Sequence, residues 1–265
     1  MPVPTNKILI VYHVSVVGWW QEIIEEQLRL LHVSGLGTAC EKIYVQLCGI
    51  KNESHFEQVK THFTRYPFYP KIQFKYINRL DTYEYPSINQ VQRVAKRNPT
   101  AHIFYFHTKG ASHGKIPPNL HWKPQQVENM KQWRRCMEYF TITKWRDCQE
   151  ALRYYDCCGI DWVKGQNWAE NQKEGDFHYS GNFWWATASY INRCTLRLGS
   201  RYNCEFFIGT GKPKAYEIFS AVKNPRLRQY FDEETLKKMF YSTDYYRKHF
   251  IFNWWNNYYD EKYYK

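Results

Sequence analysis

The sequence predicts an α/β protein whose core is a Rossmann-type, mostly parallel sheet flanked by helices. Short apolar runs alternate with segments of helical spacing through the first two-thirds of the 265 residues. Such alternation is typical of buried parallel strands joined by crossover helices. In addition, a loop rich in glycine and proline (residues 111–126) follows the fourth apolar run, where α/β proteins bind their ligands.

The first half of the chain predicts a regular series of strands and helices. The four strands are Lys7–Tyr12, Lys42–Leu47, Lys71–Ile77 and Ala101–His107. The three intervening helices are predicted over residues 19–35, 54–66 and 86–98, from apolar positions at helical spacing. Gly35 is the expected stop of the first of them.

After the loop the pattern becomes less regular. Residues 127–155 predict one or two amphipathic helices, 157–163 a strand, 177–194 a turn, a short aromatic strand and a helix, and 201–220 another short strand and a helix. We therefore expect one domain over 1–223, with a nucleotide-binding half (1–115) and an acceptor half (116–223). Residues 224–265 interleave rings with charged and amide side chains, and we interpret them as an aromatic C-terminal extension that packs on the domain.

Composition narrows the class of partner. The formal net charge of +12 favours anionic ligands, although simple solubility explains it as well. The 11 Trp and 23 Tyr exceed what filling a core needs. The eight Cys show no C-x-x-C spacing, which indicates reduced, buried thiols and a cytoplasmic location. No run of 18 apolar residues and no cleavage site occur, so neither a membrane span nor a secretory signal is expected.

The stretch FHTKG ends the fourth predicted strand. Alternation along a strand delivers His107 and Lys109 to one side, while Thr108 lies between them and Gly110 permits a sharp turn beside a ligand. A cationic pair of this kind suits a pyrophosphate, with Lys109 neutralising the leaving-group charge. His107 could also ligate a metal ion. The alternative is an ordinary surface turn.

The stretch HYSGNFWWA suits a sugar. Ser180, Gly181 and Asn182 form a polar turn able to hydrogen-bond hydroxyl groups, and Trp184 or Trp185 offers a flat face for stacking. Because side chains alternate along a strand, the two Trp rings should point in opposite directions. The alternative is a turn that opens a buried aromatic strand.

Three carboxylates are further candidates. Glu205 is the only acid in an apolar segment, where burial would raise its pKa towards that of a general base. Pairing with Arg201 is an equally good explanation. Asp81 and Glu84 lie between the third strand and the next helix, where they could contact a nucleoside, but capping of that helix is the stronger interpretation.

Together, FYFHTKG, HYSGNFWWATASYI and RYNCEFFIG resemble small GT-A-type glycosyltransferases of bacterial polysaccharide loci and large DNA viruses, over Lys7 to Ser220. The resemblance implies a GT-A-like fold and transfer of a sugar from a nucleotide diphosphate sugar to a hydroxyl of a glycan or glycoconjugate acceptor. If Glu205 is the base, we expect a single in-line displacement with inversion at the anomeric carbon. The nucleotide would be uridine by analogy. For a viral member the location would be the host cytoplasm.

The resemblance also implies roles for individual residues. Tyr12 and His13 would lie near the base, Asp81 and Glu84 near the nucleoside, His107 to Gly110 at the pyrophosphate, and Ser180 to Trp185 around the donor sugar or acceptor, with Glu205 as the base. GT-A enzymes commonly carry an Asp-x-Asp metal site after the fourth strand, whereas this chain has His-Thr-Lys there. We therefore do not expect Mn²⁺ or Mg²⁺ to be essential.

Two other functional classes are also compatible with the sequence. A nucleic-acid-binding module fits the net charge and the C-terminal rings, but the cations are spread along the chain and no recognised motif occurs. A non-catalytic carbohydrate-binding protein would also use Trp and Tyr platforms.

Overall fold

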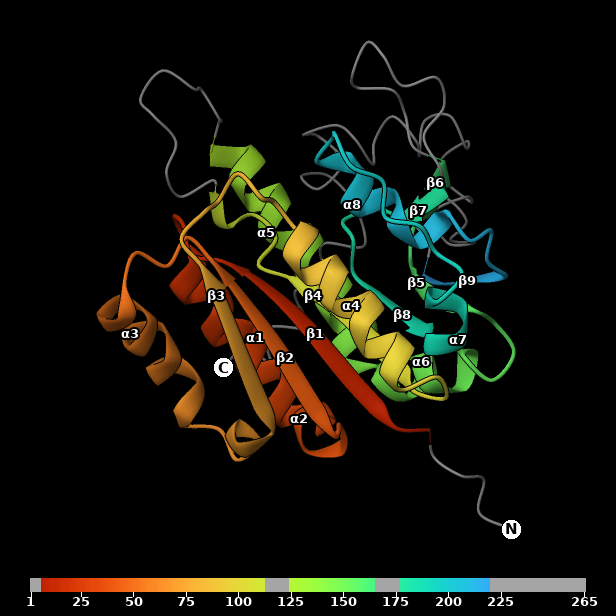
Figure 1. Cartoon of the computed structure of the whole chain (residues 1–265), viewed down its shortest axis with the longest axis horizontal. Helices are drawn as coiled ribbons and strands as arrows, with labels where there is room; N and C mark the ends of the chain where they lie inside the picture. Colours follow the sequence, from red (N-terminus) through yellow and green to blue (C-terminus); the bar gives the residue numbers. More distant parts are fainter. Residues whose placement is uncertain (1–5, 113–123, 165–176, 220–265) are drawn as a thin grey trace.

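The computed structural model describes residues 6–112, 124–164 and 177–219. Within them, seven strands form one sheet with helices against both faces (Figure 1). In spatial order the strands are β3 (Ile72–Ile77), β2 (Lys42–Cys48), β1 (Ile8–Ser15), β4 (His102–His107), β8 (Trp184–Thr187), β5 (Cys157–Ile160) and β9 (Ala215–Phe219). All neighbouring pairs are parallel except those that β8 makes with β4 and β5. The predicted α/β class with a mostly parallel sheet is confirmed.

The helices divide between the two faces of the sheet. One core contains side chains of α1 (Trp20–Val33), α3 (Glu53–Thr64), α5 (Pro124–Glu138) and α6 (Trp145–Ala151), and the other those of α4 (Tyr85–Arg97), α7 (Ala188–Ile191) and α8 (Tyr202–Phe206). The remaining elements are α2 (Leu36–Ala39), a second sheet of β6 (Trp162–Lys164) with β7 (Phe177–Tyr179), the 3-10 turns Tyr69–Lys71 and Phe207–Gly209, and the π-helical turn Tyr139–Thr143.

Burial explains why the first half folds as its sequence predicts. Successive residues of β1 are buried in opposite cores, with Ile10 on the α1 side and Val11 on the α4 side. The four predicted strands are confirmed, although β1 continues three residues further, to Ser15. Gly35 adopts a left-handed φ of 76° just after α1, which confirms it as the stop of that helix.

The strand order reverses between β1 and β4. The chain runs from β1 outward through β2 and β3, and then returns to β4 on the opposite side of β1. In an open α/β sheet such a reversal leaves a crevice at the carboxyl ends of the two strands. This topological switch point is the usual ligand site of an open α/β sheet.

The second half departs from prediction at residues 201–220. We expected a strand and then a helix, whereas the structure has α8 and a 3-10 turn followed by β9. The buried positions Cys204, Phe207 and Ile208 have i, i+3, i+4 spacing, which is helical. The predicted strand at 157–163 is likewise two strands, β5 and β6, separated by Asp161 with a left-handed φ of 51°.

Trp184 and Trp185 are both fully buried. They point in opposite directions, as predicted, but each enters a core: Trp185 stacks on Phe104 and donates to the carbonyl of Thr141, while Trp184 donates to the side chain of Asn182. The prediction that one of these rings faces a sugar is therefore wrong.

Other expectations have mixed outcomes. All eight Cys are free thiols, and every one except the half-buried Cys136 is buried, which confirms that they pack in the interior. No helix in the described segments is long and apolar enough to cross a bilayer. The predicted C-terminal extension and most of the loop after β4 lie outside the described residues. The domain limits and the cytoplasmic location stay predictions.

Replacing Trp185 tests its place in the core. We expect Trp185→Ala to lower the free energy of unfolding by about 3–5 kcal/mol, because it leaves a cavity and an unpaired carbonyl. Urea denaturation measures this. Tyr154, which is 61% exposed, provides the control, and Tyr154→Ala should change stability by about 0.5 kcal/mol or less. Equal effects of the two substitutions would contradict the buried position of Trp185.

Candidate functional site

The carboxyl ends of β1 and β4 are joined by hydrogen bonds that continue beyond the strands. The N–H of Thr108 donates to the carbonyl of His13, and the N–H of Ser15 donates to Oγ1 of Thr108 at 3.0 Å. Thr108 is buried. The Thr108 hydroxyl therefore holds the ends of β1 and β4 together. The predicted contact of Thr108 with a nucleotide sugar is wrong, because this side chain is buried and already bonded.

The Glu84 carboxylate lies at the centre of the site. It accepts hydrogen bonds from the hydroxyl of Tyr105 at 2.5 Å and from Nδ2 of Asn182 at 2.7 Å, and it lies 3.5 Å from Nδ1 of His107. Glu84 occupies the N-cap position of α4, but its side chain makes no cap hydrogen bond. The expected capping hydrogen bond is therefore absent, although the carboxylate does lie at the positive end of the helix dipole, as the same interpretation expected. Instead, Glu84 connects three stretches that are far apart in the sequence, and we call these four residues the Glu84 cluster.

His107 is a neutral ring in this cluster. Its Nε2 lies 2.9 Å from the carbonyl oxygen of Gly181, which can only accept, so Nε2 carries the proton. Burial, and then the charge of Lys109, lower the pKa of His107 to about 3, against the hydrogen bond to Gly181 and the charge of Glu205. The predicted cationic pair is therefore wrong, because the His107 ring is neutral at pH 7.

Tyr12 and His13 are also internal. Tyr12 is fully buried, stacks on Phe106 and donates to Oε1 of Gln27 at 2.6 Å. The ring nitrogens of His13 lie 2.9 Å from Oγ of Ser87 and 3.1 Å from Oγ of Ser15. The predicted contacts of Tyr12 and His13 with a nucleotide base are wrong, because both rings are enclosed by protein.

Lys109 and Gly110 form the rim of the crevice. Gly110 has a φ of 87°, which confirms the predicted sharp turn. Lys109 is half-buried, and its Nζ lies 4.9 Å from the ring centroid of Trp133 in a cation–π contact. Arg134 donates to the Lys109 carbonyl at 3.3 Å. A cation is thus held at the strand end, beside a residue that lets a ligand approach the backbone.

A cleft of about 770 Å³ opens on the other side of this turn, between α1 and α5. Its lining includes Gly110 and a buried ion network. In that network Glu26 pairs with Arg134 and Arg135, and Glu138 accepts from Gln27. Burial, and then the charge of Glu26, raise the pKa of Glu138 to about 8. The sequence analysis missed this network.

Gln27 connects the buried ion network to the carboxyl end of β4. Its Nε2 donates to the carbonyl of His107 at 3.0 Å as well as to Glu138 at 2.8 Å. In the sequence, the signal was a polar residue on the apolar face of α1, since Gln27 is buried beside Ile24 and Leu28.

The turn Ser180 to Asn182 supports the cluster from the second half of the chain. Gly181 and Asn182 have left-handed φ angles of 88° and 61°, and a Cβ on Gly181 would approach Sδ of Met137 to 2.3 Å. Asn182 is fully buried and its side chain binds Glu84 and Trp184. The prediction that Asn182 binds sugar hydroxyls is therefore wrong. Ser180 is also buried, and its N–H donates to the carbonyl of Asp161.

Glu205 lies near the cluster on α8, and not on a strand as predicted. Its charge acts on His107, and the carbonyl of the preceding residue, Cys204, accepts from Asn182 at 3.5 Å. Glu205 is half-buried, and no described residue pairs or hydrogen-bonds with its carboxylate. Arg201 donates instead to the hydroxyl of Tyr202, so the predicted pairing of Arg201 with Glu205 is wrong.

Asp81 lies apart from this arrangement. Both carboxylate oxygens accept from Arg79, at 2.9 and 2.7 Å, and the Asp81 side chain is 64% exposed. The structure thus brings together the stretches that contain Glu84, His107 and Asn182, as the sequence predicted, but it does not bring Asp81 to them.

The described residues contain no group of three or more His, Cys, Asp or Glu side chains arranged to hold a metal ion. Both nitrogens of His107 already face protein groups, Gly181 and Glu84. The independence from metal that we expected from the sequence stays a prediction.

No family model matches the chain, and no curated protein matches it. Among solved structures it resembles a crystal structure of 4-diphosphocytidyl-2C-methyl-D-erythritol synthase, with 12% sequence identity and a TM-score of 0.37, over 81% of this chain and 90% of that chain. At this TM-score the likeness does not bear on the reaction or the substrate of the chain.

The buried histidines predict acid sensitivity. The pKa of His13 is lowered from 6.5 to about 4, mainly by burial, and that of His107 to about 3. Between about pH 6.5 and pH 4 the unfolded chain binds protons that the folded chain does not, so stability falls as the pH falls. Each ring should contribute a loss of about 1.4 kcal/mol per pH unit.

Urea denaturation at pH 7 and pH 5 measures this loss. The variants His13→Asn and His107→Asn should each lose about 2 kcal/mol less than the wild type between these two values. The control is Val33→Asn, at a 50% exposed position of α1, which removes no titratable group and should lose as much as the wild type. An unchanged difference in the two buried-site variants would refute the assignment of neutral rings.

Proposed function

We propose that this protein is a GT-A-like glycosyltransferase that moves a sugar from a nucleotide diphosphate sugar, uridine-linked by analogy, to a hydroxyl group of a glycan or glycoconjugate. The observation that supports this best is the Glu84 cluster at the topological switch point. It brings the HTKG and SGN stretches together, with the half-buried Lys109 and Glu205 near them.

In the proposed reaction Lys109 stabilises the negative charge of the diphosphate leaving group. As the bond between the anomeric carbon and the diphosphate oxygen breaks, negative charge grows on that oxygen. Lys109 would neutralise it, while Gly110 lets the pyrophosphate approach the backbone. His107 is neutral and engaged with Gly181, so its proposed role is to position the strand end.

Glu205 is the proposed general base. An acceptor hydroxyl attacks the anomeric carbon from the side opposite the diphosphate, and its proton passes to the Glu205 carboxylate. This single in-line displacement inverts the anomeric configuration. The support is that Glu205 is half-buried and carries no hydrogen bond or ion pair within the described segments.

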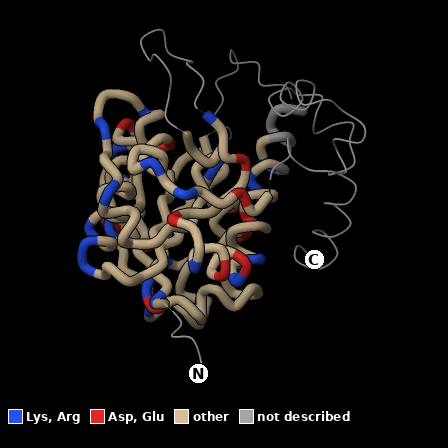
Figure 2. Tube along the Cα trace, turned by 90° about the vertical axis from the view of Figure 1, so that its right-hand side faces the viewer, with Lys and Arg blue, Asp and Glu red and all other residues tan. Residues whose placement is uncertain are grey.

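The rival classes have less support than the transferase. The two Trp rings expected to serve a carbohydrate-binding protein are buried. For nucleic acid, a basic stripe would be needed, whereas Figure 2 shows Lys and Arg scattered along the described chain with Asp and Glu among them.

A panel of nucleotide sugars tests the reaction itself. Incubated with the purified chain, one uridine diphosphate sugar should release its sugar slowly to water and faster to a glycan acceptor. Activity should be equal with EDTA and with Mn²⁺, because the proposed charge neutralisation comes from Lys109. Loss of activity in EDTA with recovery in Mn²⁺ would contradict that role, and an inert panel would contradict the proposed function.

Substitution of Glu205 tests the base. We expect Glu205→Gln to lower kcat by about 10²–10⁴-fold while affinity for the nucleoside diphosphate stays within about twofold. Glu57→Gln, an exposed position on α3, is the control and should leave kcat unchanged. Product of retained configuration, or a Glu205→Gln enzyme with normal kcat, would remove Glu205 from this role.

A further inference from the structure

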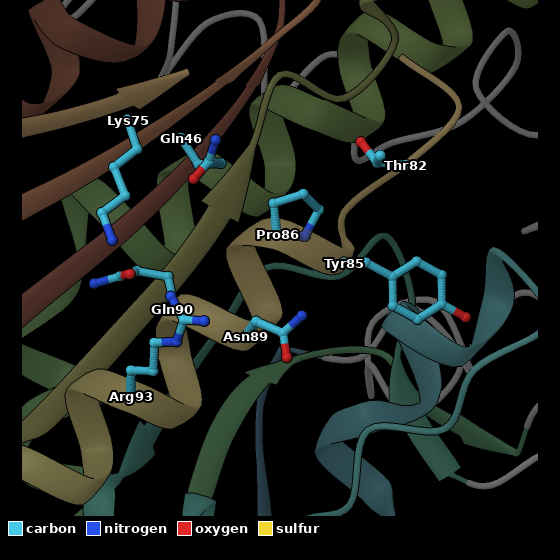
Figure 3. Close-up of a pocket in the computed structure, with 8 residues that line it drawn as sticks. All are labelled: Gln46, Lys75, Thr82, Tyr85, Pro86, Asn89, Gln90 and Arg93. Carbon is cyan, nitrogen blue, oxygen red and sulfur yellow. The ribbon is translucent and has the colours of Figure 1, made fainter. Parts of the chain in front are cut away.

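A second cavity lies beside the candidate site, on the face of the sheet that carries α4 (Figure 3). α4 packs on β1, β2 and β4, so β3 at the edge is left uncovered and its Gln73 and Lys75 are exposed. The cavity has a volume of about 380 Å³. Its lining residues are Gln46, Lys75, Thr82, Tyr85, Pro86, Asn89, Gln90 and Arg93.

This cavity continues into a groove. A smaller neighbouring cavity shares Gln46, Lys75 and Gln90 and extends along the sheet to Tyr44 and Gln73. In Figure 3 the side chains of Lys75, Gln46 and Gln90 gather at one end and those of Thr82 and Tyr85 at the other. Because Tyr85 follows Glu84 in the chain, this second end lies next to the candidate site. We call the two cavities together the β2–α4 groove.

Two amides of the groove are free to bind a ligand. Gln46 is 6% exposed and Gln90 is 8% exposed, and both side chains line the cavity (Figure 3). Neither amide has a hydrogen-bond partner among the residues that the structure describes, and the polar atoms of neither are sealed off from the cavity. A ligand in the cavity can therefore form hydrogen bonds with both amides without displacing a protein partner.

The charges in the groove have one sign. Lys75 and Arg93 line it, no carboxylate does, and neither cation has an ion pair within the described segments. By contrast, the neighbouring Arg79 is held by Asp81. Two unpaired cations, one on β3 and one on α4, attract an anion into the groove between them.

We infer that the β2–α4 groove binds an anionic carbohydrate. Its phosphate or carboxylate would lie against Lys75 and Arg93, while its hydroxyl groups would exchange hydrogen bonds with Gln46, Asn89 and Gln90. An amide both donates and accepts, as a hydroxyl does, which is why a sugar fits this set better than a bare anion. The inference does not depend on the proposed transferase reaction.

Direct titration of the full-length chain tests the inference. The probes are glucose 6-phosphate, glucuronic acid, glucose and uridine diphosphate, each measured by calorimetry. Glucose 6-phosphate or glucuronic acid should bind at least about tenfold more tightly than glucose, because a hydrogen bond to a charged group contributes at least this much affinity. The tighter of the two anions shows whether the natural ligand carries a phosphate or a carboxylate.

Substitutions test whether the anionic sugar binds in the β2–α4 groove. Lys75→Gln and Arg93→Gln should each weaken the preferred anion about tenfold and leave uridine diphosphate unaffected. Lys96→Gln and Arg97→Gln, exposed positions in the last turn of α4, are matched charge controls and should change nothing. All four positions are exposed, and thermal unfolding will verify that each variant is folded.

Three results would overturn the inference. The first is that neither anion binds more tightly than glucose, and the second is that the control variants weaken binding of the anion as much as the groove variants do. The third is that the groove variants also weaken binding of uridine diphosphate, which would make the groove part of the donor site. If uridine diphosphate fails to bind while an anionic sugar does, the proposed transferase fails and the groove stands.

Discussion

The arrangement of the whole site depends on one carboxylate, that of Glu84, whose side chain is 15% exposed. Glu84 accepts short hydrogen bonds from Tyr105 on β4 and from Asn182 in the turn before β8, and charged hydrogen bonds of this kind are among the strongest in proteins. They attach the start of α4 to the end of β4 and to the second half of the chain. Without the carboxylate, an enclosed hydroxyl and an enclosed amide would lose their partner, and the turn that holds His107 would lose its support.

The polar residues of the crevice fall into two kinds. Tyr12, His13, His107 and Asn182 are enclosed, and their hydrogen bonds are made within the protein. Lys109 and Glu205 are half-buried at the rim. A rigid, internally satisfied layer that positions a few accessible charged groups is the arrangement that catalysis and binding require. It also separates the residues that fix geometry from those that can contact a ligand.

The sequence predicted the parts of the fold that local periodicity determines. The first four strands follow from apolar runs, whereas a common site for Glu84, His107 and Asn182 was implied only by the family resemblance. Three features could not be predicted from local pattern. Trp185 packs on Phe104 of β4 and donates to Thr141 in the π-helical turn, Glu84 accepts from Asn182 across 98 positions, and the segment around Glu205 has apolar spacing that fits a short strand as well as a helix. Each depends on tertiary contacts, which override local pattern.

The state of the His107 ring tests most directly whether this site is built as described. Long-range ¹H–¹⁵N NMR spectra of the histidine side chains, with His107→Asn for assignment, report the protonation of each ring nitrogen. The structure predicts a neutral ring with the proton on Nε2, donated to Gly181, from pH 8 down to pH 5. A ring that carries its only proton on Nδ1 would contradict the hydrogen bond from Nε2 to Gly181 and the site built around it, and a ring that is doubly protonated at pH 6 would contradict the neutral state.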